Sequence, residues 1–386
     1  MPCPTHASVN LPSSTCNQDG IDWRLLLGRE PVVVDPLALA APFEDKRILI
    51  TGAGGSIGSA LANRLARFHP AHLVLLDSAE HGLYEVHNDL ATHAEAPPHT
   101  TIPGDVCDNA LLHELFSIQR PQIVFHAAAY KHVPLMEHHP LAALRTNALG
   151  TSTLAQVSQQ WGVEQLVMLS TDKAVTPSSI MGASKRIAEL ALLASDEIPT
   201  CMKALRLGNV LGSRGSVVPL FKMQIEQGGP VTVTDPDVCR YLLPLRESVE
   251  LLLSIAGPQY RTGLYIPQIG EPIRILDLAH FLIDHLAIPG SHAIPVVFTG
   301  LRPGDKLTED LLSSRETADG DGAQLLRRVR PLQSAPPDLP HAMEQLQHSI
   351  NQRATGQALQ IVRQLVPEYQ PSPVIRNCLP HPVNTL

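Results

Sequence analysis

The segment RILITGAGGSIGSALANRLA, which begins at Arg47, constrains the fold of this chain more than any other. An apolar run leads into a turn that contains Gly52, Gly55 and Gly58, and a helical pattern follows. In such a turn one glycine permits a tight bend, the second lets the backbone approach a pyrophosphate, and the third allows close helix–strand packing. The start of the helix offers free N–H groups to phosphate oxygens. The pattern predicts a strand–turn–helix unit that binds a dinucleotide.

An acidic residue follows at the distance that this interpretation requires. Asp77 ends the next apolar run, 19 residues after Gly58, where its carboxylate can accept hydrogen bonds from the adenosine ribose. A 2′-phosphate would meet a like charge there, so the sequence favours NAD over NADP. Asp105 is expected either against the adenine or as the cap of the next helix. The other residues expected to line the cofactor are Ser56, Ile57, Val106, Ala127 and Ala128.

Short apolar runs recur along the first half of the chain. They lie at 47–50, 72–76, 122–126 and 166–170, and helix-like stretches separate them. Strands that alternate with helices predict βαβ units, and therefore a Rossmann-type, doubly wound parallel sheet. The alternation fades after Leu205. We therefore expect a disordered tail at 1–22, a dinucleotide-binding domain at 23–205, a smaller substrate-binding domain at 206–312, and a linker, helices and tail at 313–386.

The C-terminal part shows two further patterns. Residues 314–340 are polar and rich in turn formers, which predicts a linker. Apolar residues then recur at helical spacing, which predicts two amphipathic helices that pack onto the body or bury a subunit contact. Their apolar faces consist of Met343, Leu346 and Ile350 in the first helix and Leu359, Val362 and Val366 in the second.

Composition excludes several classes of protein. The net charge of −8 argues against a general nucleic-acid binder, which needs a basic face. The six cysteines are scattered, which fits neither a zinc site nor a disulfide framework, and the histidines at 138–139 have no partner at ligand spacing. We find neither a signal peptide nor an apolar run of membrane-spanning length. These features predict a cytoplasmic enzyme that is not inserted in a membrane.

Several separate motifs resemble one known group. They are TGAGGSIG, HAAAYKHVPLMEHHP at 126–140, LSTDKAVTPSSIMGASKRIAEL at 169–190, LRLGNVLGSRGSVVPLF at 205–221, TVTDPDVCRY at 232–241 and LRPGDKLTEDL at 301–311. With them the chain resembles the CapD-like polysaccharide-biosynthesis proteins, from about Leu25 to the segment 365–373. These belong to the extended short-chain dehydrogenase/reductase superfamily, and the resemblance implies a 4,6-dehydratase that acts on UDP-N-acetylglucosamine.

The chain departs from that group in two ways. Long members carry transmembrane helices and an extra domain ahead of this region, so the chain resembles the soluble catalytic half alone. Ser179 stands where the group has Asn, and Pro244 where it has Thr. Both substitutions lie in segments that shape the substrate pocket, and they leave the exact sugar open.

The resemblance also implies roles for the residues of the catalytic segment. The reaction moves a hydride from C4 of the sugar to the cofactor, eliminates water across C5 and C6, and returns the hydride to C6. Asp172 would be the acid and Lys173 the base, while Lys185 would hold the nicotinamide ribose. Met181 occupies the usual Tyr position, and a thioether cannot take the C4 hydroxyl proton. We expect Met181 to pack beside the ring while Thr171, or alternatively Ser170 or a water held by Lys185, relays that proton.

Substrate anchors are expected on both sides of residue 205. Arginine suits phosphate because its planar group donates two hydrogen bonds at once. The candidates for the pyrophosphate and uridine are Lys131, Asn209, Arg240 and Arg302. Glu309 is expected on a ribose or on Arg302, and Val218, Pro219 and Phe221 are expected under the uracil, although Phe221 fits a core position equally well.

Two other functions are compatible with these motifs. A nucleotide-sugar 4-epimerase shares the cofactor and the hydride step, but it needs no acid and base at C5 and C6, so Asp172 and Lys173 favour the dehydratase. A non-catalytic NAD(P)-binding regulator would explain the missing Tyr, but not the presence of Asp172, Lys173 and Lys185. Analogy with related folds predicts a homo-oligomer.

Overall fold

The structure is a computed structural model. It describes residues 21–93, 96–194, 199–287, 292–319, 325–331 and 338–379. The expected disordered tail lies outside these residues except for its last two positions, and Ile21 is buried.

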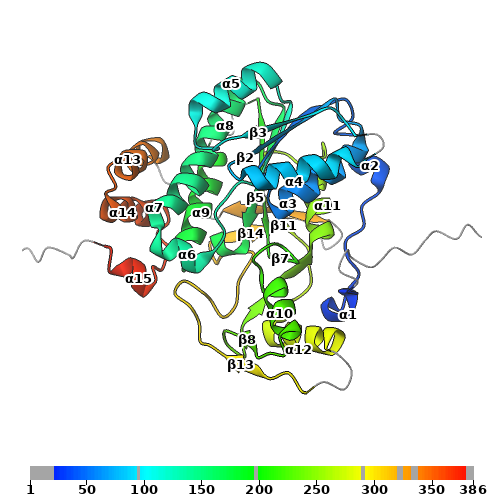
Figure 1. Ribbon diagram of the computed structural model, residues 1–386. Coiled ribbons are helices and arrows are strands. Elements are labelled where there is room, and N and C mark those ends of the chain that lie inside the picture. The colour runs from blue at the N-terminus through cyan, green and yellow to red at the C-terminus, as the bar shows by residue number, and fades with distance from the viewer. Residues whose placement is uncertain are drawn as a thin grey trace, which may run out of the picture.

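Nine strands of the described residues form one sheet, in the order β14-β15-β11-β6-β5-β4-β1-β2-β3 (Figure 1). Neighbouring strands from β3 to β11 are parallel. The parallel strands are β1 (Arg47–Thr51), β2 (His72–Asp77), β3 (His99–Pro103), β4 (Ile123–His126), β5 (Gln165–Thr171), β6 (Cys201–Leu207) and β11 (Gly263–Pro267). The four apolar runs are β1, β2, β4 and β5, so the Rossmann-type sheet is confirmed.

Both faces of the sheet are covered because the side chains of each strand alternate. On β1, Ile48 and Ile50 pack on one face, and Leu49 packs on the other. The first face carries α3 (Ser56–Leu65), α4 (Glu80–Ala91) and α11 (Leu245–Ser254). The second carries α5 (Asn109–Gln119), α8 (Gly150–Gln160) and α9 (Ile180–Leu192). Because the strands from β3 to β11 are parallel, their carboxyl ends lie at one edge of the sheet.

The prediction of a linker at 314–340 is wrong. It contains β14 (Glu316–Ala318) and β15 (Leu326–Pro331), and β15 pairs antiparallel with both β11 and β14. Leu326 and Val329 are buried, whereas the neighbouring arginines concealed the strand in the sequence. Arg328 reaches a carbonyl instead of solvent, since its Nη2 donates to the Thr262 oxygen at 2.6 Å.

The segment after β6 forms a smaller layered unit below the sheet (Figure 1). Helices α10 (Val217–Glu226) and α12 (Ile275–Leu286) pack with α1 (Arg24–Leu27) around an apolar cluster. Short strand pairs complete it: β7 (Asn209–Leu211) with β10 (Leu242–Pro244), β9 (Cys239–Arg240) with β12 (Ile273–Arg274), and β8 (Val231–Val233) with β13 (Val296–Phe298). Because β11 and α11 return to the main sheet within this segment, the boundaries at 205 and 312 stay a prediction.

The two predicted amphipathic helices are present at the C-terminal end, and they pack on the body, which was the first of the two alternatives expected from the sequence. They are α13 (Leu339–Asn351) and α14 (Thr355–Leu365), and their apolar faces share a cluster with α9 and Met181. The remaining short elements are α2 (Pro36–Ala40), η1 (Ala66–Phe68), α6 (Val133–His138), α7 (Pro140–Ala143), the π-helical segment η2 (Leu144–Leu149), η3 (Asp172–Ala174) and α15 (Pro373–Arg376). Among all described helices, none is long and apolar enough to cross a bilayer.

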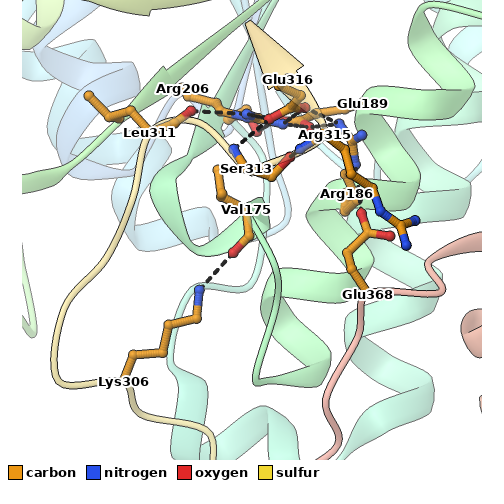
Figure 2. A network of polar contacts seen from close by, with 11 residues as sticks. Val175, Arg186, Glu189, Arg206, Lys306, Leu311, Ser313, Arg315, Glu316 and Glu368 are labelled. Atoms are coloured by element: carbon orange, nitrogen blue, oxygen red, sulfur yellow. Dashed lines mark hydrogen bonds and ion pairs between the residues drawn. The ribbon is translucent and has the colours of Figure 1, made fainter. Parts of the chain in front are cut away.

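A buried ion cluster connects α9 to the sheet (Figure 2). The Arg206 side chain on β6 is 0% exposed and donates to both oxygens of Glu189 and of Glu316 at 2.8–2.9 Å. Its remaining N–H donates to the Leu311 carbonyl at 3.0 Å, so all five donors are used. Arg186 pairs with the same two carboxylates at 2.9 and 3.2 Å. The cluster therefore fixes α9 against β6 and β14.

Removal of Arg206 should destabilise the fold strongly. Arg206→Met leaves two buried carboxylates without their main partner, and we expect a loss of about 3–5 kcal/mol in the free energy of unfolding, measured by urea denaturation. The matched control is Arg274→Met. Arg274 pairs with Asp277 at 2.8 Å, but the two side chains are exposed, Arg274 by 54% and Asp277 by 42%. The control should leave the free energy of unfolding nearly unchanged, because the pair is exposed to solvent. Similar losses in the two variants would contradict a structural role for the cluster.

Candidate active site

The glycine-rich turn lies where β1 and β4 separate, at the topological switch point of the sheet. Gly52 has φ of +70°, and a Cβ on it would lie 2.5 Å from the Ala128 nitrogen. A Cβ on Gly58 would lie 2.0 Å from the Gly52 oxygen. A Cβ on Gly55 would lie 3.2 Å from its nearest neighbour, the Gly52 oxygen, so Gly55 faces more open space than the other two glycines. The three glycines thus have the geometry that a dinucleotide-binding turn needs.

Asp77 is held against this turn by backbone N–H groups. Its Oδ2 accepts from the Gly54 nitrogen and its Oδ1 from the Ala79 nitrogen, both at 2.9 Å. Gly54 also packs against α4, where a Cβ would meet Gly82 at 2.8 Å. Gly54 was not predicted from the sequence to contribute to this turn, although it stands inside the motif. The arrangement leaves lone pairs on Asp77 for a ribose.

Asp105 is not the cap of α5. That position belongs to Asp108, whose side chain accepts from the Leu111 nitrogen at 3.1 Å. Asp105 instead accepts from the Cys107 nitrogen at 2.9 Å and pairs with Arg145 at 2.9 Å. Burial opposes its ionisation, but these two partners together hold the pKa of Asp105 below its usual value. The alternative against the adenine stays a prediction.

Lys185 is buried beside the turn. Its Nζ donates to the Leu169 carbonyl at 2.7 Å, and burial, partly opposed by Glu189, lowers the pKa of Lys185 to about 8. Neighbouring His126 is held by two hydroxyls, Thr51 at 2.7 Å and Thr151 at 2.9 Å. Burial and the charge of Lys185 lower the pKa of His126 to about 3, so the imidazole is neutral.

Asp172 and Lys173 lie at the carboxyl end of β5, on the same edge as the glycine-rich turn. The Lys173 Nζ donates to Asp172 Oδ1 at 2.9 Å and to Asn209 Oδ1 at 2.8 Å. The Asp172 side chain is 0% exposed, and its Oδ2 has no hydrogen-bond partner. A buried carboxyl oxygen without a partner is costly unless a ligand or a proton satisfies it. This oxygen is therefore available for chemistry.

Glu309 completes this group from a distant segment. Its Oε1 lies 3.9 Å from the Lys173 Nζ, and its Oε2 lies 3.3 Å from the Lys306 Nζ. Lys306 is itself fixed on the Val175 carbonyl at 2.6 Å (Figure 2). Burial raises the pKa of Glu309, and the Lys173 ammonium offsets only part of that rise. Glu309 thus faces Lys173, whereas the expectation on Arg302 is wrong because Arg302 pairs with Asp305 at 2.8 Å.

The structure separates the two hydroxyls that the sequence left open. Thr171 Oγ1 donates to Asp172 Oδ1 at 2.9 Å. Ser170 Oγ points into the ion cluster and donates to Glu189 Oε1 at 2.7 Å. Met181 is buried in an apolar cluster with the C-terminal helices. Thr171 is therefore the hydroxyl connected to the Asp172–Lys173 pair.

Several contacts that the sequence did not reveal fix α9 over this pair. A Cβ on Gly182 would lie 2.2 Å from the Lys173 carbonyl oxygen, so only glycine allows the approach. Ser179 caps the helix by accepting from the Gly182 nitrogen at 3.1 Å, which is a role that Asn also performs well.

Two side chains from other segments hold α9 as well. Glu137 accepts from the Ile180 nitrogen at 2.7 Å. Asn147 donates to Ser184 at 2.9 Å and holds the backbone of residue 130.

The expected substrate residues divide into two groups. Val218 and Phe221 are buried in the apolar cluster of the second unit, which shows the core role for Phe221. The Arg240 guanidinium is used by the carbonyls of residues 239, 306 and 307 at 2.7–2.9 Å. Asn209 accepts a hydrogen bond from Lys173, as described above, and Lys131 donates to the Arg214 carbonyl at 2.6 Å. Pro219 is partly exposed, and Arg302 is exposed. Among the described residues, no group of three potential metal ligands occurs.

Comparison with known proteins gives a consistent result. The family model described as "Polysaccharide biosynthesis protein" matches residues 48–330. The chain is 43% identical to the capsular polysaccharide biosynthesis protein CapD of Staphylococcus aureus, over 75% of this chain and 49% of that protein. It is 34% identical to a UDP-N-acetylglucosamine 4,6-dehydratase (inverting) of Campylobacter jejuni, over 71% of this chain and 80% of that protein.

Other relatives catalyse a different reaction by name. A UDP-glucose 4-epimerase of Rickettsia canadensis is 36% identical over 72% of this chain and 81% of its own length. The structure of the Bordetella bronchiseptica enzyme WbmG in complex with NAD has a TM-score of 0.56 and 25% identity, over 69% of this chain and 84% of that one. The chain spans about half the length of the first curated relatives it matches.

The buried carboxyl of Glu309 predicts a pH-dependent stability. The stability that a protonated Glu309 contributes is fully present below its unfolded pKa of about 4.3 and is lost as the pH rises through its raised folded pKa. Glu309→Gln abolishes this loss, so the free energy of unfolding of the variant relative to the wild type should increase between pH 4.5 and 7.5. Urea denaturation at both pH values measures it. The exposed neighbour supplies the control, because Asp310→Asn should show no such increase. A constant difference for Glu309→Gln would contradict the raised pKa.

Proposed function

Since the chain belongs to the polysaccharide biosynthesis protein family, we propose that it is a nucleotide-sugar 4,6-dehydratase. Its substrate is a UDP-N-acetylhexosamine, with UDP-N-acetylglucosamine as the first candidate, and the product is the 4-keto-6-deoxy sugar for a surface polysaccharide. The observation that carries the proposal is the Thr171–Asp172–Lys173 group, in which the buried Asp172 keeps an unpartnered Oδ2.

The cofactor is NAD(P), with NAD favoured. The glycine-rich turn fits a dinucleotide, and a relative in structure, WbmG, was solved with NAD. Asp77 would hold the adenosine ribose, and its negative charge disfavours a 2′-phosphate. Lys185 would hold the nicotinamide ribose and provide positive potential. The bound cofactor supplies a hydride acceptor for C4 and later a hydride donor for C6.

Elimination uses Lys173 and Asp172. The cycle starts with Asp172 as the carboxylate and Lys173 as the free amine, whose ammonium form releases its proton to solvent before the reaction. The C4 ketone acidifies the C5 proton, which the Lys173 amine takes, while Asp172, protonated during the oxidation, gives its proton to the C6 hydroxyl, so that water leaves. Hydride then adds to C6, and the Lys173 ammonium returns its proton to C5. Lysine and cofactor thus return to their initial states, and the only net product besides the sugar is water.

The contact between Thr171 and Asp172 accounts for the missing Tyr. As hydride leaves C4, the C4 hydroxyl gives its proton to Thr171, which passes its own proton to Asp172 Oδ1 across 2.9 Å. Asp172 is then the acid that the next step requires. The proton from O4 therefore departs with O6, and Met181 needs only to pack beside the ring.

Substrate anchoring follows the same proposal. Lys131 and Arg302, which keep exposed surface, are the candidates for the UDP phosphates, and Pro219 for the uracil. Arg240, whose Nη1 and Nη2 donate to three carbonyls, instead shapes the loop that carries Lys306 and Glu309. Asn209 positions Lys173. A homo-oligomer stays a prediction.

The first experiment distinguishes the reaction types. Purified protein is incubated with NAD and UDP-N-acetylglucosamine in D2O, and the products are analysed by mass spectrometry. A dehydratase gives a product that has lost one water. In D2O the Lys173 amine carries two solvent deuterons beside the proton that it takes, so most product molecules should contain deuterium at C5. An isomer of unchanged mass would establish the 4-epimerase instead, which the epimerase relatives make the second candidate. Absence of turnover with several UDP-sugars, together with NAD binding, would favour a non-catalytic role.

Variants at three neighbouring positions test the proton path. Thr171→Val should lower kcat by about 100-fold or more, because it removes the relay hydroxyl without changing the side-chain shape. Ser170→Ala is the matched control and should leave kcat nearly unchanged, since Ser170 serves the ion cluster. Met181→Leu should retain substantial activity because it conserves packing. Near-total loss in a folded Met181→Leu protein would refute its packing role.

A further inference from the structure

The segment 212–216, GSRGS, crosses from the second unit to the glycine-rich turn. Arg214 makes three contacts there: its backbone nitrogen donates to Ser56 Oγ at 2.9 Å, and its Nη1 to the Gly54 carbonyl at 3.3 Å. Its Nη2 donates to Glu85 Oε2 on α4 at 2.6 Å. The partners are 129–160 residues away in the sequence, so the fold brings this arginine to the dinucleotide turn.

The segment is also fixed from its other side. The Lys131 Nζ donates to the Arg214 carbonyl at 2.6 Å. Gly215 has φ of +69°, and a Cβ on it would lie 2.9 Å from the His132 ring. The backbone of Arg214 is thus held between the 131–132 loop and the turn, whereas its guanidinium stays 62% exposed. With a fixed backbone and an exposed guanidinium, Arg214 can change its hydrogen-bond partner without a movement of the main chain.

The pair that Arg214 forms with Glu85 is weak enough to exchange. The two side chains are 62% and 40% exposed, and such surface pairs contribute little to stability. A phosphate diester beside the turn offers a stronger, charge-assisted partner. Ser56 Oγ accepts the Arg214 N–H, so its own hydroxyl proton stays available to the same phosphate.

We propose that Arg214 is a cofactor-binding residue supplied by the second unit. When the dinucleotide enters, the guanidinium leaves Glu85 and binds a pyrophosphate oxygen above the glycine-rich turn, while Ser56 donates its hydroxyl to that pyrophosphate. Cofactor binding then also secures the 212–216 segment, and with it the connection from β7 to α10. This inference rests on the cofactor part of the proposed function, and it is independent of the reaction.

Isothermal titration of the cofactor-free full-length chain tests it, with NAD, NADP and UDP as separate ligands. Arg214→Ala should weaken the binding of NAD and NADP alike by about tenfold or more, since hydrogen bonds to charged groups have this magnitude. Glu85→Gln should make NAD binding severalfold tighter, because it removes the competitor for Arg214, and an unchanged or weaker affinity would contradict the exchange. Arg274→Ala, which breaks the exposed pair between Arg274 on β12 and Asp277 on α12, should change the affinity for neither NAD nor NADP.

The outcomes separate this inference from the wider proposal. If the wild type binds neither dinucleotide, the cofactor assignment itself fails. If the wild type binds NAD and Arg214→Ala binds it equally well, only the role of Arg214 is overturned. Equal weakening by Arg214→Ala and Glu85→Gln would show that the ion pair merely supports the fold. Weakening of NADP alone, or of UDP alone, would assign Arg214 to a 2′-phosphate or to the substrate. Should Arg214→Ala not fold, the direction of the Glu85→Gln effect decides the question.

Discussion

The structure depends on one buried cation, Arg206, and on the two carboxylates that enclose it. A guanidinium in the core is tolerated only when each of its donors has a partner, and here Glu189, Glu316 and the Leu311 carbonyl satisfy all of them. These partners come from α9, β14 and the segment before it. Satisfying the charge therefore fixes the rotation of α9 relative to β6, with the antiparallel edge of the sheet attached.

The candidate site uses the rigidity that this cluster provides. Lys185 lies one helical turn before Glu189, so the interaction that anchors Glu189 also directs Lys185 toward the Leu169 carbonyl. At the start of the same helix, Gly182 lies against the Lys173 carbonyl. One helix thus sets the positions of Lys185, the proposed cofactor-binding lysine, and of Lys173, the proposed base. A site on rigid elements keeps its geometry better than a site on loops.

The sequence predicted the parts of the site that are encoded locally. The glycine-rich turn, Asp77 and the Asp172–Lys173 pair each lie in a short segment whose pattern has a direct physical meaning. Of the two partners expected for Glu309, Arg302 was wrong, because nothing in the sequence shows that the loop at 302–309 is held by Arg240 on β9 and by the contact of Lys306 with the Val175 carbonyl. β15 was mistaken for a linker because its three arginines resemble a solvated segment, although Arg327 and Arg328 donate to carbonyls in the structure.

The proposed chemistry also explains why a methionine is compatible with catalysis here. A Tyr in that position would take the O4 proton and hold it apart from the group that later protonates O6. With Thr171 hydrogen-bonded to Asp172, the proton released in the first step reaches the acid of the second step directly. No proton has to leave or enter the site between oxidation and elimination. Glu309 and Asn209 then need only to hold Lys173 in place, and position 181 can hold an apolar side chain that packs with the C-terminal helices.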